Sequence, residues 1–195
     1  MAIFRQDADF TKSVFSGVAL FNSILFERDA KFGYAKFRGY SSFESAIFSG
    51  EDHFLNAIFS KTITFFKAIF RGNSDFRKVV SEGDTYFMEA KFNDGVTFQN
   101  ATFKEIIVLS STETVGIFNG WNSIKNNISC DETTYLNLIK NFKDHGLFND
   151  ADQCYFKYRC EYISSPLDWF GWITCGFGVR LDFIIGWSII IIISF

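Results

Sequence analysis

The phenylalanine residues of this chain follow a spacing that alternates between five and six, and this spacing constrains the fold more than any other feature. Stepping six and then five residues from Phe4 reaches a phenylalanine at every position as far as Phe103 except one, where Ser81 stands. A small residue, usually alanine or serine, precedes most of these positions by two. Residues two apart in an extended chain share a face, so each unit points one small and one large side chain the same way.

The spacing excludes the two commonest regular structures. An eleven-residue repeat is typical of some right-handed helical supercoils. On a helix, however, a five-residue step turns the side chains roughly 140° apart and would split the phenylalanines into two stripes. A single long strand fails because a five-residue step reverses the face and a six-residue step keeps it. The remaining arrangement is a chain that turns a corner after every short strand, so that all the rings point to one axis. This arrangement is an all-β solenoid.

Glycine marks the corners of this solenoid. Six of the longer gaps contain a glycine, whereas Gly33 is the single glycine in a five-residue gap up to Phe103. The longer gap holds one extra residue, and glycine tolerates the positive φ that a bulged corner often needs. We therefore predict bends, several with positive φ, in the longer gaps at Gly17, Gly39, Gly50, Gly72 and Gly83.

The rings form the predicted core. If four units close one coil, residues 22 apart stack in four columns, and Ser81 leaves a hole that Val79 partly fills. Each buried ring contributes roughly 2–3 kcal/mol of gross transfer free energy, which offsets the ordering of a chain with little other core. The predicted core residues are Phe10, Phe15, Phe21, Phe26, Phe32, Phe37, Phe43, Phe48, Phe54, Phe59, Phe65, Phe70, Phe76, Phe87, Phe92, Phe98 and Phe103.

This pattern of a small residue and a large apolar residue in units of about five resembles the pentapeptide-repeat family, in its phenylalanine-rich branch. The resemblance covers Ala2 to about Leu109. It implies a right-handed quadrilateral β-helix, here with about 22 residues per coil because of the six-residue units. Some members bind DNA gyrase by mimicking the charge of DNA. Residues 1–110 carry 13 basic and 13 acidic residues, which weighs against that class.

After the repeat, the sequence predicts a helical cap. Residues 110–129 lose the spacing and are rich in polar and turn residues, so we interpret them as a connector. Tyr135, Leu138, Ile139 and Phe142 then recur at helical spacing, and Gly146 is placed to end that helix. A second helix is expected to begin at an N-cap, Asn149, with Asp150 and Asp152 in its first turn. The predicted domains are the β-helix at 1–110, a connector and two-helix cap at 111–165, and a last segment at 166–195.

The last segment has the composition of a membrane interface. Pro166 breaks the second helix, and the apolar run of residues 183–195 predicts the start of a membrane helix, although a full span needs about 20 residues. The predicted interface residues are Trp169, Trp172, Arg180 and Trp187. The motif "TCGFG" at 174–178 mimics a potassium-channel filter, but no apolar helix precedes it, so a glycine-rich turn is the preferred interpretation.

Residues 133–195 resemble the linker of archaeal and bacterial pentapeptide-repeat proteins that end in a small ion-channel domain. This resemblance implies that the β-helix lies in the cytoplasm, that the protein is membrane-associated, and that a pore would follow Phe195 in a longer, untruncated chain. It assigns no pore residue to this chain.

No catalytic or metal-binding pattern stands out. The four cysteines form no C-x-x-C pair, so we expect reduced thiols, no metal site and no cofactor. His53 is predicted to face solvent and His145 to end a helix, without a nucleophile motif nearby. Asp150 and Asp152 are interpreted as helix-start residues rather than ligands. A net charge of −3 predicts no nucleic-acid partner, and the protein is not expected to be an enzyme.

Two functions remain open at this point. The preferred one is a non-enzymatic, membrane-associated scaffold, the cytosolic domain of a truncated ion-channel-like protein. The alternative is a soluble interaction module, such as a topoisomerase-binding protein. The repeat is already in register at Ala2 and Phe4, so the first coil offers unpaired strand edge, and we expect self-association or a protein partner at the solenoid end.

Overall fold

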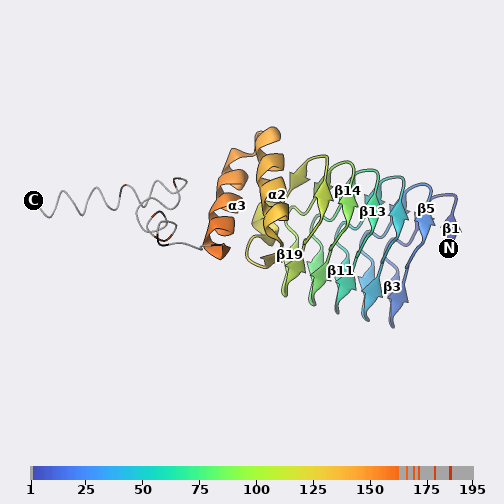
Figure 1. Cartoon of the computed structure of the whole chain (residues 1–195). Helices are drawn as coiled ribbons and strands as arrows, with labels where there is room; N and C mark the ends of the chain where they lie inside the picture. The colour runs from blue at the N-terminus through green and yellow to red at the C-terminus, as the bar shows by residue number, and fades with distance from the viewer. Residues whose placement is uncertain are drawn as a thin grey trace, which may run out of the picture.

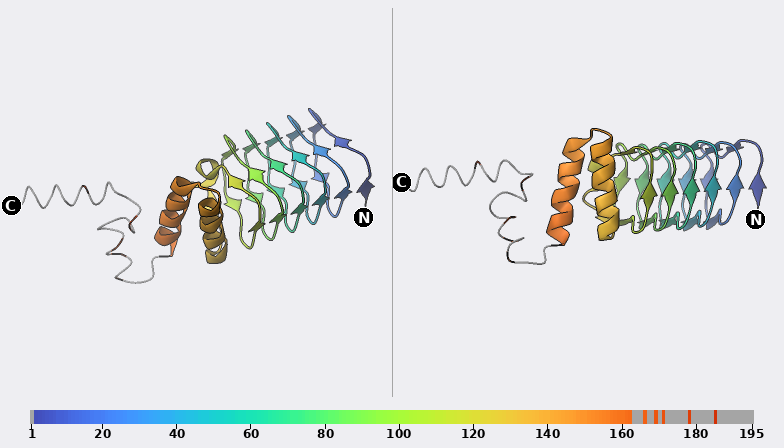
Figure 2. Two further views of the ribbon diagram at one scale, coloured as in Figure 1. Left: turned by 90° about the horizontal axis from the view of Figure 1, so that it is seen from above. Right: turned by 45° about the horizontal axis from the view of Figure 1, so that its top comes forward.

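The computed structural model describes residues 2–162 and five single residues beyond them, Pro166, Trp169, Gly171, Gly178 and Ile185. Short strands stack in a row from the N-terminus, and helices close the other end of the row (Figure 1). The two further views show the same order, with every coil of strands beside the next and the helices at one end (Figure 2).

The strands are each two residues long and form four parallel sheets, one on each side of the coil. The first sheet contains β1 (Ile3–Phe4), β5 (Leu25–Phe26), β9 (Ile47–Phe48), β13 (Ile69–Phe70), β17 (Lys91–Phe92) and β21 (Glu113–Thr114). The second contains β2 (Ala8–Asp9), β6 (Ala30–Lys31), β10 (Asp52–His53), β14 (Ser74–Asp75), β18 (Val96–Thr97) and β22 (Phe118–Asn119).

The other two sheets complete the coil. The third contains β3 (Val14–Phe15), β7 (Lys36–Phe37), β11 (Ile58–Phe59), β15 (Val80–Ser81) and β19 (Thr102–Phe103). The fourth contains β4 (Ala19–Leu20), β8 (Ser41–Ser42), β12 (Ile63–Thr64), β16 (Thr85–Tyr86), β20 (Ile107–Val108) and β23 (Ile128–Ser129). The chain therefore visits the four sheets in turn, and each strand pairs with the strand one coil away.

The strand register confirms the predicted coil of 22 residues. Phe4 is aligned with Phe26, and Phe70 with Phe92. The last pair departs from this spacing, because Ile128 lies opposite Ile107, 21 residues before it.

The solenoid continues past the predicted boundary at residue 110. Strands β21, β22 and β23 all pair with the coil before them, inside the stretch that the sequence pattern assigns to a connector. In β22 the order of large and small residues is inverted: Phe118 takes the small-residue place opposite Val96, and Gly120 comes where a ring is expected. A Cβ on Gly120 would lie 2.7 Å from the carbonyl carbon of Phe98, so a ring does not fit there.

Positive φ occurs in the five-residue gaps, not in the six-residue gaps. Ten non-glycine residues at an eleven-residue spacing have φ between 54° and 61°. Each follows a ring position or Leu109 by two and is the third residue of a turn, as in the bond from the Ser13 N–H to the Phe10 carbonyl. The N–H of this left-handed residue donates to the next coil, for example from Lys12 to Gly33. These residues are Lys12, Ser23, Tyr34, Ser45, Asn56, Lys67, Lys78, Glu89, Asn100 and Ser111.

The prediction of positive φ at the corner glycines is therefore wrong, although the bends themselves are present. Gly17, Gly39, Gly50, Gly72 and Gly83 all lie at bends, and none of them has φ in the left-handed range. At Gly39, Gly50, Gly72 and Gly83 the role of glycine is spatial, because each touches the preceding coil at this corner. A Cβ on Gly39 would lie 2.4 Å from the carbonyl oxygen of Gly17, and one on Gly72 would lie 2.4 Å from that of Gly50.

The rings stack in columns along the solenoid axis. Phe54 is stacked between Phe32 and Phe76, with ring centroids 4.9 Å away on each side. Rings of neighbouring columns meet edge to face, as Phe54 and Phe65 do at 5.5 Å. Both arrangements are favoured by the ring quadrupole, beyond the burial of apolar area.

Ser81 interrupts one column without leaving unpaired groups. Its hydroxyl donates to the carbonyl of Gly83 at 3.0 Å and accepts from the hydroxyl of Thr85 at 2.8 Å. All three groups are on one corner of the coil, and both Ser81 and Thr85 are buried. A small polar network thus replaces one ring, and Val79 is buried two residues before it.

Within residues 2–162 the structure describes three helices. The four-residue α1 (Trp121–Ile124) lies between β22 and β23, and α2 (Glu132–Asp144) and α3 (Phe148–Glu161) form an antiparallel pair over the end of the solenoid (Figure 1). Asp131 caps α2, since its carboxylate accepts from the N–H of Thr134 at 2.7 Å. The cap of two helices is therefore present, with α1 in addition.

The junction between α2 and α3 is tighter than the sequence indicates. Gly146 has φ of 73° and ends α2 as predicted, in a motif where Gly146 donates to Lys143 and Leu147 to Phe142. The N-cap of α3 is then Leu147, without a side-chain cap bond, and not Asn149. Leu147 packs against the core, so the turn begins α3 two residues earlier.

No helix within the described residues is long and apolar enough to cross a membrane. The predicted membrane helix at 183–195 lies outside the described residues, apart from Ile185. The filter-like motif at 174–178 also lies outside them, apart from Gly178.

Candidate interaction surfaces

The predicted core residues lie inside the solenoid, with a gradient at its first coil. From Phe26 to Phe98 every predicted ring has an exposed fraction of 2% or less, and Phe21 and Phe103 have 8% and 7%. Phe10 and Phe15 are only partly buried, and Phe4, which begins the first column, is 36% exposed. The core is thus closed at the helical end and open at the first coil.

Of the predicted interface residues, Trp169 is described and is 56% exposed. Trp172, Arg180 and Trp187 lie outside the described residues. Their role at a membrane interface stays a prediction.

The two histidines considered as catalytic residues each contact a residue close to them in sequence. His53 Nε2 lies 3.5 Å from a carboxylate oxygen of Glu51, and His145 is the C-cap of α2, with its Nδ1 2.8 Å from the Asn141 carbonyl. Among the described residues, no three His, Cys, Asp or Glu side chains are grouped to hold a metal ion. Asp150 lies in the first turn of α3, as its helix-start interpretation requires, but the prediction for Asp152 is wrong, because α3 begins at Phe148 and its first turn ends before Asp152.

Cys130 and Cys154 are free thiols. Cys130 and Cys154 are buried and Cys160 is exposed. Burial raises the pKa of Cys130 to about 12 and also raises the pKa of Cys154, so both carry their protons at neutral pH. Protonated, buried thiols are poor nucleophiles and poor metal ligands.

Sequence reasoning missed a buried carboxyl group. Asp52 occupies the small-residue position before Phe54 and is fully buried. One of its oxygens accepts from the Ser74 hydroxyl at 2.8 Å, and the other, Oδ1, has no hydrogen-bond partner. Burial, with the nearby charges of Asp75 and Glu51, raises the pKa of Asp52 well above its usual value, against the opposing effect of the Ser74 bond. An aspartate in the alanine position was the available signal.

The second sheet carries a groove on its outer face. The groove has a volume of about 430 Å³ and crosses β10, β14, β18 and β22. Because Gly95 has no side chain, the groove is open between the side chains of Asn73 and Ile117. Its lining residues are Glu51, His53, Asn73, Ser74, Asp75, Arg77, Gly95, Val96, Thr97, Gln99, Ile117 and Asn119.

Charge is confined to one end of this groove. Arg77 binds both carboxylate oxygens of Asp75, at 2.9 and 2.8 Å. Partial burial acts to raise the pKa of Asp75, but the hydrogen bonds and charge of Arg77 outweigh it and lower the pKa. The other end is neutral, with Thr97, Gln99 and Asn119 supplying hydroxyl and amide groups. Elsewhere on the solenoid, exposed charges pair between coils, as Lys91 and Glu113 do at 2.9 Å.

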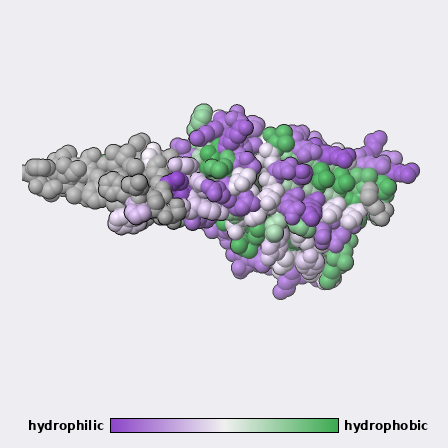
Figure 3. Space-filling model, in the orientation of Figure 1, coloured by the Kyte–Doolittle hydropathy of each residue, from purple (hydrophilic) through white to green (hydrophobic). Residues whose placement is uncertain are grey.

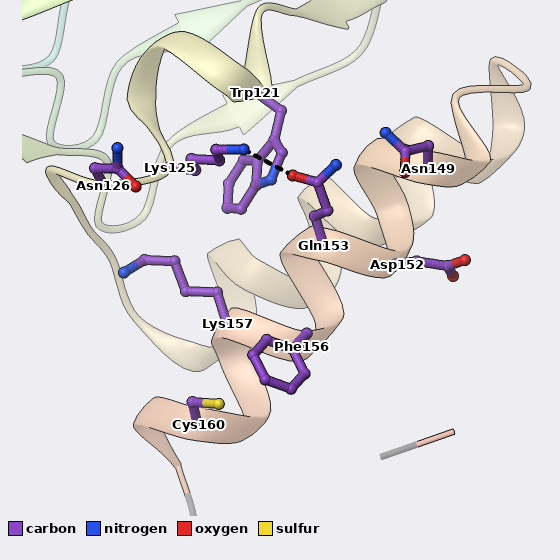
Figure 4. A pocket seen from close by; sticks show the side chains of 9 residues that line it. All are labelled: Trp121, Lys125, Asn126, Asn149, Asp152, Gln153, Phe156, Lys157 and Cys160. Atoms are coloured by element: carbon purple, nitrogen blue, oxygen red, sulfur yellow. Dashed lines mark hydrogen bonds between the residues drawn. The ribbon is translucent and has the colours of Figure 1, made fainter. Parts of the chain in front are cut away.

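A larger pocket lies where the solenoid meets the helices. It has a volume of about 710 Å³, and its walls come from α1, the turn after it, and α3 (Figure 4). Figure 4 shows Trp121 between the side chains of Lys125 and Gln153. The lining residues are Trp121, Lys125, Asn126, Asn149, Asp152, Gln153, Phe156, Lys157 and Cys160.

The first coil exposes apolar side chains. Strands β1, β2, β3 and β4 each pair with a neighbour on one side only within the described residues. Apolar groups gather at this end of the space-filling view (Figure 3). The exposed fractions are 46% for Ile3, 36% for Phe4, 49% for Val14, 66% for Val18 and 61% for Leu20.

The comparison with protein families identifies part of the solenoid. Residues 65–106 match the family model for pentapeptide repeats (9 copies). Residues 65–106 therefore consist of pentapeptide repeats. The matched residues contain strands β13 to β19, where the 22-residue pairing is regular. The same strand pairing continues beyond the matched residues toward both ends of the solenoid. Comparisons with curated proteins and with solved structures gave no match.

Proposed function

We propose that this pentapeptide-repeat protein is a non-enzymatic interaction module that binds a polypeptide along the groove of the second sheet. The observation that carries the proposal is the groove itself, a hollow of about 430 Å³ across four successive coils. Its repeated strands hold outward side chains at a fixed spacing, which suits an extended or helical segment of a partner. The expected right-handed winding of the coil rests on the family resemblance.

The chemistry of the groove supports a polypeptide partner. Thr97, Gln99 and Asn119 offer both donors and acceptors, which match peptide groups of either polarity. Ile117 is 38% exposed at the groove and offers an apolar contact. The charged end, with Glu51, Asp75 and Arg77, adds a position where charge selects the partner.

Site-specific photocrosslinking tests the groove. A photoreactive amino acid at Gln99, in the groove, is compared in cells with one at Lys36, which is exposed on β7 of the third sheet. We expect a discrete crosslinked species from position 99 that disappears when Thr97→Trp fills the groove and persists with the matched Lys36→Trp. Equal crosslinking from both faces, or a species that Thr97→Trp leaves unchanged, would exclude the groove as the binding surface.

A second copy of the chain is a further candidate partner, at the first coil. Two features of the first coil favour self-association. Its strand edges are unpaired within the described residues, and exposed parallel edges pair readily with other strands. Its phenylalanine rings, beginning with Phe4, are partly exposed. Light scattering of the full chain in mild detergent should show a species larger than a monomer. Val14→Lys should shift it to monomer, whereas Val115→Lys, at a residue 72% exposed in the loop after β21, should not. A monomer of the parent protein would contradict this.

Membrane attachment through residues 166–195 remains part of the proposal for the whole protein, with the β-helix in the cytoplasm. It rests on the apolar composition of that segment and on the interface tryptophans. Pelleting of membranes after carbonate washing tests it. Recovery of the chain in the pellet is expected, and complete release into the supernatant would favour an interaction module without membrane attachment.

A further inference from the structure

The indole N–H of Trp121 is a buried donor without a partner. The Trp121 side chain is 1% exposed, and its Nε1 makes no hydrogen bond. Leaving such a donor unpaired is energetically unfavourable, so a native structure normally supplies an acceptor from protein, water or ligand. Trp121 lines both the larger pocket and a second hollow beside Asn119 and Asp150, but its Nε1 is covered, so an acceptor reaches this atom only when a neighbouring side chain moves.

The local structure brings a cation next to this donor. Lys125 is the C-cap of α1 and donates its backbone N–H to the Trp121 carbonyl at 2.9 Å, so both side chains leave the same turn. The Lys125 ammonium donates to Gln153 at 3.0 Å and to Asn122 at 2.8 Å. In Figure 4 this bond to Gln153 passes over the indole, and the ring nitrogen faces the α3 side of the pocket.

Lys125 is the cation beside the indole in Figure 4. Lys157 is paired with Glu161 at 2.8 Å, whereas Lys125 forms no salt bridge among the described residues, although its charge acts to lower the pKa of Asp150. The carboxylate of Asp152 points away from Trp121 in Figure 4. A single positive charge and two adjacent donors match the two oxygens of a monovalent, planar anion better than a phosphate dianion.

We propose that the larger pocket binds a small organic carboxylate. One carboxylate oxygen accepts from the Trp121 N–H, and the other takes the place of the Gln153 amide oxygen on the Lys125 ammonium. Gln153 is half-buried and rotates aside to admit the ligand. The cavity of about 710 Å³ falls in the range of small-molecule sites. Phe156 and the carbon chains of the lysines provide apolar wall for the body of the ligand.

The test uses benzoate as the probe and the indole N–H resonances of the ¹⁵N-labelled full chain as the readout. The Trp121 resonance is assigned by its loss in Trp121→Phe or, if that variant does not fold, by elimination with Trp169→Phe, Trp172→Phe and Trp187→Phe. We expect benzoate to shift the Trp121 resonance saturably, while benzyl alcohol, which has the same ring without the charge, leaves it in place.

Two variants and one control distinguish binding at this site from a general effect of benzoate on the protein. Lys125→Met should weaken benzoate binding about tenfold or more, because one charge-assisted bond is lost. Gln153→Ala should strengthen binding several-fold, because the competing amide is removed. Lys140→Met, on α2 and away from the pocket, should leave the affinity unchanged. No saturable shift at millimolar benzoate, or the same affinity in Lys125→Met, would overturn the proposal and leave an ordered water as the partner of Trp121.

Discussion

At the scale of single residues, the corner glycines show whether glycine is needed for positive φ or for the absence of a Cβ atom. Gly39 and Gly17 occupy the same kind of corner in adjacent coils, and neither has positive φ. A Cβ on Gly39 would lie 2.4 Å from a backbone oxygen, but one on Gly17 would meet nothing within 4 Å. Gly39→Ala should therefore lower the free energy of unfolding by about 1–3 kcal/mol, as overpacking does. Gly17→Ala should be neutral or stabilising by about 0.4–1 kcal/mol. Chemical denaturation measures both, and similar values would refute the spatial explanation.

The stacked rings make a second prediction at this scale. Phe54 is fully buried and stacked on both sides, so Phe54→Ala leaves a cavity and should cost roughly 3–5 kcal/mol of stability. Phe4→Ala, at a ring that is 36% exposed with a stacked neighbour on one side, should cost clearly less. Urea unfolding of the two variants gives the comparison. A cost below about 1 kcal/mol for Phe54→Ala would mean that the columns do not carry the stability.

Asp52 predicts a pH dependence. Its pKa in the folded state is raised by burial, so between the usual aspartate pKa and the folded value the unfolded chain loses this proton first. The contribution of Asp52 to stability is fully present below the unfolded pKa and is lost as the pH rises through the folded pKa. Asp52→Asn should remove this loss of stability at high pH. It should raise the free energy of unfolding by roughly 1–3 kcal/mol at pH 8 and change it little at pH 3.5. Thermal melts across pH measure it, and a gain independent of pH would contradict the buried-acid account.

At the scale of elements, the left-handed turn residues are the strained positions of the coil. Lys78 is exposed and has φ of 56°. Lys78→Val places a β-branched side chain in this conformation and should cost about 1–2 kcal/mol, whereas Lys78→Gly should be nearly neutral. Lys36→Val, in strand β7, is the matched control and should be tolerated, because strands favour valine. Equal effects of valine at positions 78 and 36 would show that the turn carries no strain.

These elements also show what the sequence can predict. The ring spacing predicts the coil and its columns, because nearly every repeat unit carries the same spacing signal. The left-handed positions were hidden because lysine, serine, tyrosine and glutamate occupy them as readily as asparagine. The last coil was hidden because Phe118 and Gly120 invert the usual order of sizes. The groove and the Trp121 pocket depend on contacts between distant segments, which no local pattern displays.

At the scale of the whole molecule, the solenoid is a one-dimensional stack. Each coil contacts its neighbours, α2 closes the last coil, and the first coil has a free edge within the described residues. Stability in such a stack is approximately a sum of coil and interface contributions. Removing a complete coil should therefore shorten the stack without disturbing the rest, whereas removing an incomplete coil should misalign every column beyond it.

Thermal unfolding of two internal deletions, followed by circular dichroism, tests the 22-residue coil most directly. Deleting residues 50–71 leaves Phe48 and Phe76 six residues apart, which restores the alternating spacing. Deleting residues 50–69 leaves them eight apart and breaks it. We predict a cooperative transition for the 22-residue deletion, at a midpoint somewhat below that of the parent, and loss of the cooperative transition or a far lower midpoint for the 20-residue deletion. Equal midpoints for the two deletions would contradict the coil on which every surface described above depends.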